Sequence, residues 1–492
     1  MTDELAARDK QAIDEHFHKI GLPREPALTF KDAAIKPRYN EIRIRSEIWD
    51  FSTTLIGDVA INIPLISANM TSVTDAKFAA ALEREGGFGC FPQAVLSCVQ
   101  DQMIDDTRRN NAARIDDPLK ITPYATIAEA KKLMETKQVW SLIVVDADKR
   151  PIGILSSRDW RYETDLTQKV SALMTTNIIK CRDTDSVEAV KVIMRRNKIE
   201  KIPIVDEAGK LVGLYTAHGL FYKMHHTRAL RDEHGRFPVM GTVGVGERLN
   251  TELMEQVNRL AKKGIQFLLI DAAKGGSDNL KEVVLWVKKE LPNLPIMAGN
   301  VCTPEETKLL IEWGVDTIKV GQGPGYVCRT REIGIGIPQL TAVAECSAIA
   351  NLYDKLVVAD GGMDTPGDFM KAIIAGATAC MAGKFFMSTY EAAAPLEPPD
   401  DDGLPFKLYK GSASFDAQME RIQDGSLDHP RRPEGRTRKV IVTGSLKDKI
   451  YDLLEAFKSG MSYVGARNWE EMREIAVMRW QTPAGSFEGL KR

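Results

Sequence analysis

The stretch Lys319–Gln339 reads KVGQGPGYVCRTREIGIGIPQ and joins a short apolar strand, expected at Thr317–Val320, to a glycine-rich loop. The loop carries a single cysteine, Cys328, with Thr330 two residues further on. Glycine permits positive φ angles and lets backbone N–H and C=O groups approach a ligand closely. An isolated cysteine is more often a buried apolar residue, but the combination of thiol, hydroxyl and glycines favours a functional loop.

Similar strand–helix units lie on both sides of this loop. Between residues 237 and 390, short apolar runs predict strands at Val239–Val245, Gln266–Asp271, Pro295–Gly299, Leu356–Ala359 and Ala379–Ala382. The segments between them have helical periodicity, at Thr251–Lys263, Leu280–Lys289, Pro304–Glu312 and Pro366–Ala375. This alternation is typical of parallel βα units.

Further units precede this region. Residues 63–70 are expected to form a buried strand, residues 74–85 a helix that ends at Gly86, and residues 87–93 the next strand. The number of βα units then approaches eight, which predicts an α/β fold of the (β/α)8 TIM-barrel type. A doubly wound open sheet is the alternative, but the glycines follow no single dinucleotide-binding unit.

An internal repeat lies between about residues 118 and 223. The first copy contains ITPYATIAEAKKLM and SLIVVDADKRPIGILSSRDW, and the second contains IKCRDTDSVEAVKVIM and IPIVDEAGKLVGLYTAHGL. Asp146 aligns with Asp206, and Gly153 with Gly213. Two such copies can bury a shared face. We therefore expect residues 1–115 and 227–492 to form the barrel, residues 116–226 an inserted module, and residues from about 405 to 440 a long loop that covers the active site.

The composition indicates an ordinary globular protein. Hydrophobic residues make up 43% of the chain, charged residues 27%, and the net charge is −2, which predicts neither a nucleic-acid-binding nor a membrane surface. The seven cysteines are scattered, without a Cys-x-x-Cys pair, as expected for reduced thiols in the cytoplasm. The polar, acidic amino terminus does not resemble a signal peptide.

The expected carboxyl ends of the strands carry polar residues and glycines. In a barrel of this type these ends form the active site. They supply Asn69 and Met70, Asp271, Gly299–Asn300, the Gly321–Cys328 loop, Asp360–Gly362 and Gly383–Lys384. Each has an ordinary structural explanation: Asp271 as a helix cap, Asp360 as part of a turn and Lys384 as a solvated lysine. Their shared location on one face is what predicts a site.

Several segments resemble the IMP dehydrogenase and GMP reductase family. They are Ser67–Met70 (SANM), Gly299–Val301 (GNV), Lys319–Gln339, Asp360–Gly362 (DGG), Tyr409–Gly411 (YKG) and Tyr463–Ala466 (YVGA). The resemblance spans nearly the whole chain. It implies a purine nucleotide substrate, GMP or IMP, a nicotinamide cofactor, and homotetramers that can pair into octamers.

The same resemblance implies a role for individual residues. Cys328 attacks C2 of the purine and Thr330 assists proton transfer, as expected for a thiolate that splits one difficult exchange into two easier steps. The implied substrate-binding residues are Asn69, Met70, Tyr326, Asp360, Gly361, Gly362, Gly383, Lys384, Tyr409, Gly411 and Ser412. Those on the cofactor side are Asp271, Ala272, Gly321 and Gly323. The carbonyls of Gly323, Gly325 and Cys328 match those that bind a monovalent cation such as K⁺.

The repeat resembles tandem CBS motifs, a Bateman module, which usually bind adenine or guanine nucleotides such as ATP or GTP. Ser156, Ser157 and Asp159 match the nucleotide-contacting pattern in the first copy. The second copy has Thr216, but Gly219 occupies the position of the carboxylate. A purely structural insertion is the alternative.

Two reactions within the family share the cysteine adduct. The dehydrogenase oxidises IMP with NAD and activates water with an Arg-Tyr pair on its flap, whereas the reductase converts GMP with NADPH and uses the threonine and a glutamate. Residues 411–438 contain no Arg-Tyr pair but contain Glu434 in the segment PEGRT. We therefore predict a GMP reductase that uses Cys328, Thr330 and Glu434. An IMP dehydrogenase is the alternative, favoured by the presence of the CBS repeat, and a catalytically idle nucleotide sensor is a third possibility.

Overall fold

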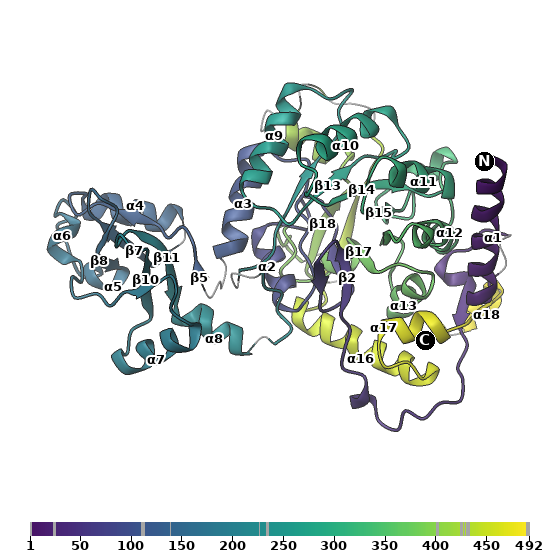
Figure 1. The fold of residues 1–492 in the computed structure, drawn as a ribbon, viewed down its shortest axis with the longest axis horizontal. Helices are drawn as coiled ribbons and strands as arrows, with labels where there is room; N and C mark the ends of the chain where they lie inside the picture. Colours follow the sequence, from purple (N-terminus) through teal and green to yellow (C-terminus); the bar gives the residue numbers. More distant parts are fainter. Residues whose placement is uncertain are drawn as a thin grey trace. The chain divides into compact units, whose positions relative to one another are not determined.

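The computed structural model describes residues 2–22, 26–109, 114–137, 139–225, 227–232, 236–399, 403–423, 427, 429 and 433–488. The chain forms two compact units (Figure 1). Unit 1 comprises Met1–Thr107, Arg228–Leu230 and Pro238–Arg492, and unit 2 comprises Arg108–Thr227 and Arg231–Phe237. Unit 2 thus overlaps the stretch that the sequence assigns to the inserted module.

Unit 1 is built on a curled sheet of seven parallel strands in the order β12-β13-β14-β15-β16-β17-β4. The strands are β4 (Leu65–Ser67), β12 (Met240–Val243), β13 (Phe267–Asp271), β14 (Ile296–Val301), β15 (Thr317–Val320), β16 (Leu356–Asp360) and β17 (Ala379–Ala382). Their side chains are almost all buried on both faces, as a parallel sheet covered by helices requires. The TIM-barrel fold predicted from the alternating pattern is confirmed.

The eighth position of the barrel is occupied by residues 87–93, for which a strand was expected. Only Phe88 forms a bridge there, parallel to Ile66 of β4. On the other side, the Thr242 hydroxyl of β12 donates to the Phe91 carbonyl at 2.6 Å. Pro92 has no N–H to offer, so a regular ladder cannot continue through this segment. Side-chain and isolated backbone bonds therefore link β4 to β12.

Helices surround the sheet (Figure 1). They are α2 (Ala76–Arg84), α3 (Ser97–Arg109), α9 (Thr251–Lys262), α10 (Asp278–Glu290), α11 (Pro304–Glu312), α12 (Gln339–Leu352), α13 (Pro366–Ile374) and α14 (Lys384–Met387). Five of them begin at a side-chain cap, at Asp75, Asn250, Ser277, Thr303 and Thr365. These caps explain why the starts of the helices could be placed from the sequence to within a few residues.

The helix α12 was not expected, because its residues are small or apolar on every side and give no amphipathic period. It is buried over nearly its whole length, from Gln339 to Ala350. The amino-terminal helix α1 (Thr2–Ile20) packs against it, as Figure 1 shows. His16 of α1 bonds to the Ala375 carbonyl at 2.8 Å, and Lys308 forms an ion pair with Asp9 at 2.5 Å. A helix covered on all sides is hydrophobic all round.

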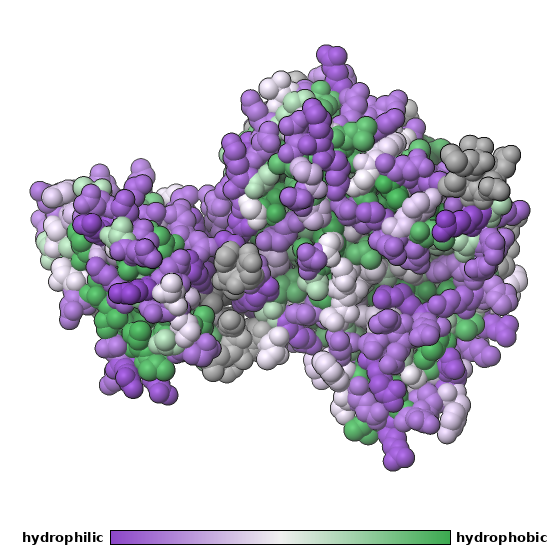
Figure 2. All heavy atoms as spheres, viewed as in Figure 1, coloured by the Kyte–Doolittle hydropathy of each residue, from purple (hydrophilic) through white to green (hydrophobic). Residues whose placement is uncertain are grey.

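The remaining elements of unit 1 include two short strand pairs and three carboxyl-terminal helices. Two short pairs lie outside the barrel sheet, β1 (Ala33–Ile35) with β20 (Met478–Trp480) and β2 (Thr53–Ile56) with β3 (Val59–Ile61). The carboxyl-terminal helices are α16 (Leu446–Val464), α17 (Trp469–Ile475) and α18 (Pro483–Glu488). Hydrophilic residues predominate on the face shown in Figure 2. No helix among the described residues is both long and apolar enough to cross a bilayer.

The stretch from about 405 to 440 is not simply the long loop that we expected. β18 (Phe406–Lys410) pairs antiparallel with β19 (Thr437–Ile441), and α15 (Phe415–Gln423) lies between them. The sequence FKLYK alternates in burial, since Lys407 and Tyr409 are buried. That period of two is the signal for a strand. Residues 433–436, directly before β19, are therefore attached to an antiparallel strand pair.

Unit 2 contains the two copies of the repeat. The first copy supplies β6 (Lys120–Ile121), α4 (Ile127–Thr136), β7 (Ser141–Val145), β8 (Pro151–Ser156), α5 (Ser157–Trp160) and α6 (Val170–Leu173). The second supplies β9 (Cys181–Arg182), α7 (Val187–Asn197), β10 (Lys201–Val205), β11 (Leu211–Thr216) and α8 (Ala217–His225). The preceding strand β5 (Arg114–Ile115) pairs with β11.

The two copies match at their hairpin turns. The Asp146 carboxylate accepts from the Arg150 N–H, and the Asp206 carboxylate accepts from the Lys210 N–H, both at 2.8 Å. Buried residues of both copies form one apolar cluster, which consists of Ile143, Val145, Leu211 and Leu214. The shared buried face expected of the repeat is present.

Candidate active site

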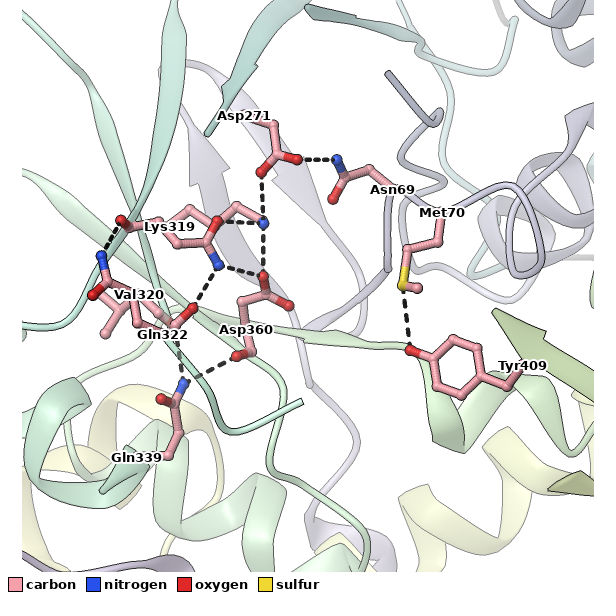
Figure 3. A network of polar contacts seen from close by, with 11 residues as sticks. Asn69, Met70, Asp271, Lys319, Val320, Gln322, Gln339, Asp360 and Tyr409 are labelled. Carbon is pink, nitrogen blue, oxygen red and sulfur yellow. Dashed lines mark hydrogen bonds and ion pairs between the residues drawn. The ribbon is translucent and has the colours of Figure 1, made fainter. Parts of the chain in front are cut away.

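The carboxyl ends of the barrel strands converge on one buried lysine, Lys319 of β15 (Figure 3). Its ammonium group donates to Asp271 at 3.0 Å and to Asn300 at 2.8 Å, and it lies 2.6 Å from the Asp360 carboxylate. The Asn300 amide also donates to Asp360 at 2.8 Å. We call Asn69, Asp271, Asn300, Lys319 and Asp360 the strand-end network. The structure thus brings Asn69, Asp271, Asn300 and Asp360, which the sequence places at strand ends, together around Lys319.

The charge of Lys319 is stabilised by its surroundings. The residue is only 3% exposed. Burial alone would lower the pKa of Lys319, but the carboxylates of Asp271 and Asp360 outweigh it and raise the pKa above its ordinary value. The lysine therefore stays charged and holds two carboxylates from β13 and β16 at fixed positions.

Asn69 and Met70 connect the strand-end network to the hairpin. The Asn69 amide donates to the Asp271 carboxylate at 3.0 Å. Beside it, the Tyr409 hydroxyl of β18 contacts the Met70 sulfur at 3.3 Å (Figure 3). Burial raises the pKa of Tyr409, so its phenol stays neutral. Gly383 has to be glycine, because an added Cβ would overlap the Tyr409 hydroxyl.

The loop after β15 presents the thiol. The Cys328 sulfur lies 3.1 Å from the Thr330 hydroxyl, and its N–H donates to the Gly325 carbonyl at 3.0 Å. Thr330 begins a short 3₁₀ helix, Thr330–Ile333. The side chain of Cys328 is partly exposed, unlike those of Cys90, Cys302, Cys346 and Cys380, which are buried. It is the one cysteine in the described strand-end region that is both accessible and paired with a hydroxyl.

The segment before β19 lies directly against this loop. The Arg329 N–H donates to the Glu434 carbonyl at 3.1 Å, and the Arg436 N–H donates to the Val327 carbonyl at 2.9 Å. Cys328 and Gly435 form an antiparallel bridge. The structure therefore brings the backbone of Glu434 next to Cys328 and Thr330, while the Glu434 side chain is exposed. We call residues 325–330 and 433–436 together the cysteine layer.

The other residues expected on the substrate side lie around these two groups. Gly361 and Gly362 follow β16 with φ angles of 82°, and an added Cβ on Gly361 would come within 3.3 Å of the Gly325 backbone. The Gly361 N–H already donates to the Met381 carbonyl at 3.1 Å. Gly411 is buried in the hairpin, whereas Ser412 is exposed.

Two of the residues expected on the cofactor side, Ala272 and Gly321, have their backbone groups engaged. Ala272 donates to the Gly299 carbonyl and accepts from the Asn300 N–H, both at 2.7 Å. Gly321 cannot carry a side chain, because an added Cβ would overlap the Asp360 carbonyl. The Gly325 carbonyl, one of the three expected to bind a cation, accepts from Cys328. Among the described residues there is also no cluster of three His, Cys, Asp or Glu side chains that could hold a metal.

Sequence reasoning missed two contributors, Lys319 and Arg438. Lys319 stands in the quoted stretch but was given no role, because a lysine inside an apolar strand carries no pattern that marks it as central. Arg438 was taken for part of a solvated basic run, yet its guanidinium lies 4.7 Å from the centre of the Tyr326 ring.

The candidate regulatory residues of unit 2 form helix caps. The Asp159 carboxylate accepts from the Ser156 N–H at 2.6 Å and from its hydroxyl at 2.9 Å. In the second copy the Thr216 hydroxyl accepts from the Gly219 N–H at 3.1 Å. The Ser157 N–H donates to the Trp140 carbonyl at 2.9 Å. The copies thus use different side chains for the same cap.

The chain is similar to known proteins of two kinds. The model of the IMP dehydrogenase / GMP reductase domain matches residues 27–491. An inosine-5'-monophosphate dehydrogenase of Aquifex aeolicus is 37% identical over 469 residues, 94% of each chain. One from Staphylococcus aureus (strain Mu50) is 34% identical over 471 residues, 94% of this chain and 95% of that protein.

Among solved structures, chains similar to this one include GMP reductases. A Cys-to-Ala variant from Trypanosoma brucei in complex with guanosine 5'-monophosphate has a TM-score of 0.86 and 31% identity, and the match covers 94% of this chain and 97% of that one. The enzyme in complex with guanosine 5'-triphosphate has a TM-score of 0.76 and 28% identity, over 93% and 98% of the two chains. The relatives therefore carry two different activities.

Proposed function

Because the chain belongs to the IMP dehydrogenase / GMP reductase family, we propose that it is a GMP reductase, which converts GMP to IMP and ammonia with NADPH. The observation that carries the proposal is the cysteine layer. The segment that lies against Cys328 contains Glu434, and no tyrosine occurs between residues 410 and 450. Hydrolysis of a cysteine adduct needs an activated water, whereas expulsion of ammonia needs an acid.

The residues of this layer suit the reductive reaction. The Cys328 thiolate adds to C2 of GMP, and the amino group leaves as ammonia after it gains a proton. The Thr330 hydroxyl, 3.1 Å from the sulfur, is placed to pass that proton, and Glu434 is its source once the carboxyl turns inward. Bound NADPH would supply a hydride to C2, and cleavage of the C–S bond would then release IMP and the thiolate. One adduct thus links loss of ammonia to reduction.

The strand-end network suits the two riboses. Asp360 would accept from the hydroxyls of the substrate ribose, and Asp271 from those of the nicotinamide ribose. The Asp271 side chain is 18% exposed, and each of its carboxylate oxygens accepts one bond, from Asn69 or from Lys319. A carboxylate oxygen has a second lone pair, so this residue fits the cofactor. Ala272, Gly321 and Gly323 would border the same side.

The alternative is an IMP dehydrogenase, and the sequence relatives with that name favour it. The chain's Arg-Tyr dipeptides, Arg38-Tyr39 and Arg161-Tyr162, lie outside the hairpin. Their tyrosines are 94% and 90% exposed, and Tyr162 belongs to unit 2. Neither pair is placed in the cysteine layer, so the base for hydrolysis has no evident source there.

The proposal includes regulation and assembly. Unit 2 would bind a purine nucleotide effector, ATP or GTP, through Ser156, Ser157 and Asp159, and the enzyme would act as a cytoplasmic homotetramer that can pair into octamers. A monovalent cation such as K⁺ would sit at the carbonyls of Gly323, Gly325 and Cys328. Titration with each nucleotide, for wild type and Asp159→Ala, tests the effector site.

Absorbance at 340 nm tests the reaction. Loss of signal from NADPH with GMP supports the reductase, and gain of signal from NAD with IMP supports the dehydrogenase. Neither change, with nucleotide binding intact, would support the idle sensor. The Cys328→Ala variant is the control for each substrate pair, because it removes the nucleophile that both reactions need.

A further inference from the structure

Lys407 of β18 is a buried lysine whose two described partners are both neutral. The residue is 2% exposed. Its ammonium group donates to the main-chain carbonyls of Tyr390, at 3.0 Å, and Ala392, at 2.5 Å. The lysine therefore ties β18 to the backbone that follows α14, and we call residues 390–394 the clamp segment.

The burial of this ammonium group costs free energy. A charge removed from water is unfavourable unless a counter-ion accompanies it. Burial lowers the pKa of Lys407, although the charges of Glu391 and Asp75 oppose this. Each of these carboxylates accepts a backbone N–H instead, from Leu446 at 2.8 Å and from Phe78 at 2.7 Å. What Lys407 contributes is a fixed link between two segments rather than a favourable burial.

The clamp segment also contacts the loop after β4, which carries Met70. Two of its N–H groups donate to carbonyls of that loop, Ala393 to Val73 at 3.1 Å and Ala394 to Ser72 at 2.8 Å. The Ser72 hydroxyl in turn donates to the Lys410 carbonyl of β18 at 3.3 Å. The clamp segment therefore joins the Met70 loop to β18.

Strand β18 carries this link to the cysteine layer. Lys407 and Tyr409 are both buried and stand two positions apart, so they lie on the same face of the strand. Tyr409 contacts the Met70 sulfur at 3.3 Å. Gly411 directly follows the strand, and its N–H donates to the Arg436 carbonyl at 2.9 Å. The place at which Lys407 fixes β18 therefore determines where Gly411 meets the cysteine layer.

We infer that Lys407 is a positioning residue for the reaction: by fixing β18 to the clamp segment, it holds residues 433–436 against Cys328. Its described contacts are to the main chain, so it acts through the strand and not on the reacting atoms. The inference rests on the proposed chemistry at Cys328 but not on the direction of the reaction.

A second lysine offers a matched control. Lys449 of α16 donates to the hydroxyl of Ser388, just before the clamp segment, at 2.5 Å. Burial lowers the pKa of Lys449 as well, and the charge of Asp452 opposes this. The two lysines thus have similar surroundings and hold neighbouring backbone, but only Lys407 belongs to the strand that leads to the cysteine layer.

The test compares Lys407→Met with Lys449→Met in the full-length protein, using the substrate pair that the wild type converts. We expect Lys407→Met to lower kcat about 10- to 100-fold and to leave the Kd for the nucleotide within about threefold, since a small displacement of reacting groups affects the rate more than binding. Lys449→Met should keep both near their wild-type values. Initial rates and calorimetric titrations measure the two quantities.

A second measurement does not depend on turnover. The Cys328 thiol is partly exposed and can be alkylated by iodoacetamide, and mass spectrometry of its peptide follows the rate. Because residues 433–436 should leave the thiol more often in Lys407→Met, we expect alkylation about three- to tenfold faster than in wild type. Lys449→Met should react at the wild-type rate.

Ser72→Ala decides the question if Lys407→Met does not fold. It removes only the hydroxyl that donates to the Lys410 carbonyl, so it loosens β18 mildly. It should lower kcat about two- to fivefold, as loss of one hydrogen bond predicts. An unchanged kcat in Ser72→Ala would then contradict the inference.

Other outcomes overturn the positioning role directly. Unchanged kcat and an unchanged alkylation rate in Lys407→Met would do so, as would equal losses of kcat in the two lysine variants or a parallel loss of kcat and nucleotide affinity. A wild-type protein that converts neither substrate pair would refute the proposed reaction. The alkylation rates would still decide whether Lys407 holds residues 433–436 against Cys328.

Discussion

The strand-end network and the cysteine layer share one barrel mouth but are built in opposite ways. In the first, Lys319 is 3% exposed and its three polar partners come from β13, β14 and β16. In the second, Cys328 is partly exposed and Glu434 is exposed, and backbone bonds between two loops hold them together. A rigid network suits the binding of parts that both family reactions share. A layer contributed by a hairpin suits the step in which the reactions differ, and a few substitutions can change it.

The largest expected effect comes from the cysteine layer. Cys328→Ala should abolish turnover, by roughly 10⁴-fold or more, because no other group can form the adduct. GMP binding should persist, since the strand-end network is untouched. Initial rates and calorimetric binding check both points. Cys98→Ala, at an exposed cysteine of α3, is the control and should keep full activity. Turnover in Cys328→Ala would show that the adduct is not required.

A change in the strand-end network should damage stability as well as binding. Lys319→Met leaves the partly buried carboxylates of Asp271 and Asp360 without their cation, which costs about 3–5 kcal/mol of unfolding free energy. Denaturant titration measures this loss. Lys355→Met is the comparison, because Asp316 keeps its second partner, Lys288, at 2.7 Å and should lose much less. Equal losses in the two variants would mean that the network is not the rigid part.

A milder change in the cysteine layer should separate chemistry from binding. Glu434→Gln should lower kcat with GMP about 100-fold, the usual value of a general acid, while the dissociation constant for GMP stays within about twofold. Glu420→Gln, in α15 of the same hairpin, removes a carboxylate paired with Lys410 and is the control. An unchanged kcat in Glu434→Gln would remove this residue from proton transfer.

The smallest expected effect concerns the pH dependence of stability, to which His16 contributes from outside both regions. Burial lowers the pKa of His16, although its bond to Ala375 opposes this. The folded state then binds the proton less readily than the unfolded state, so stability is present above the unfolded pKa of about 6.5 and declines as pH falls below it. His16→Gln should therefore lose less stability than wild type between pH 7.5 and pH 5.5, as thermal unfolding can measure. An equal decline in both proteins would contradict this.

The sequence predicts the regular part of the fold well for a physical reason. The strand Thr317–Val320, the strand Ala379–Ala382 and the helix Pro304–Glu312 were predicted with the bounds that the structure has. Each is a short apolar run or a capped amphipathic pattern next to glycine or proline. Helix α12 was not named from the sequence, because a helix that is buried on all sides has no amphipathic period. Strands β18 and β19 were not predicted, because their lysines and arginines suggested a solvated loop.

Only the part of the site that follows from the geometry of a barrel could be predicted from the sequence. Because the carboxyl ends of parallel strands lie on one face of a barrel, Asn69, Asp271 and Asp360 could be placed together from the sequence alone. The position of Lys319 among them depends on which way one strand's side chains face. The stacking of Arg438 on Tyr326 joins residues more than a hundred positions apart, and no local pattern encodes that contact.

The most direct test of the reductase assignment is product analysis with both substrate pairs in one enzyme preparation. With GMP and NADPH, we predict IMP and ammonia in a one-to-one ratio with the NADPH consumed, and no such conversion by Cys328→Ala. Formation of XMP from IMP and NAD, without consumption of GMP, would contradict the account and assign the cysteine layer to hydrolysis instead.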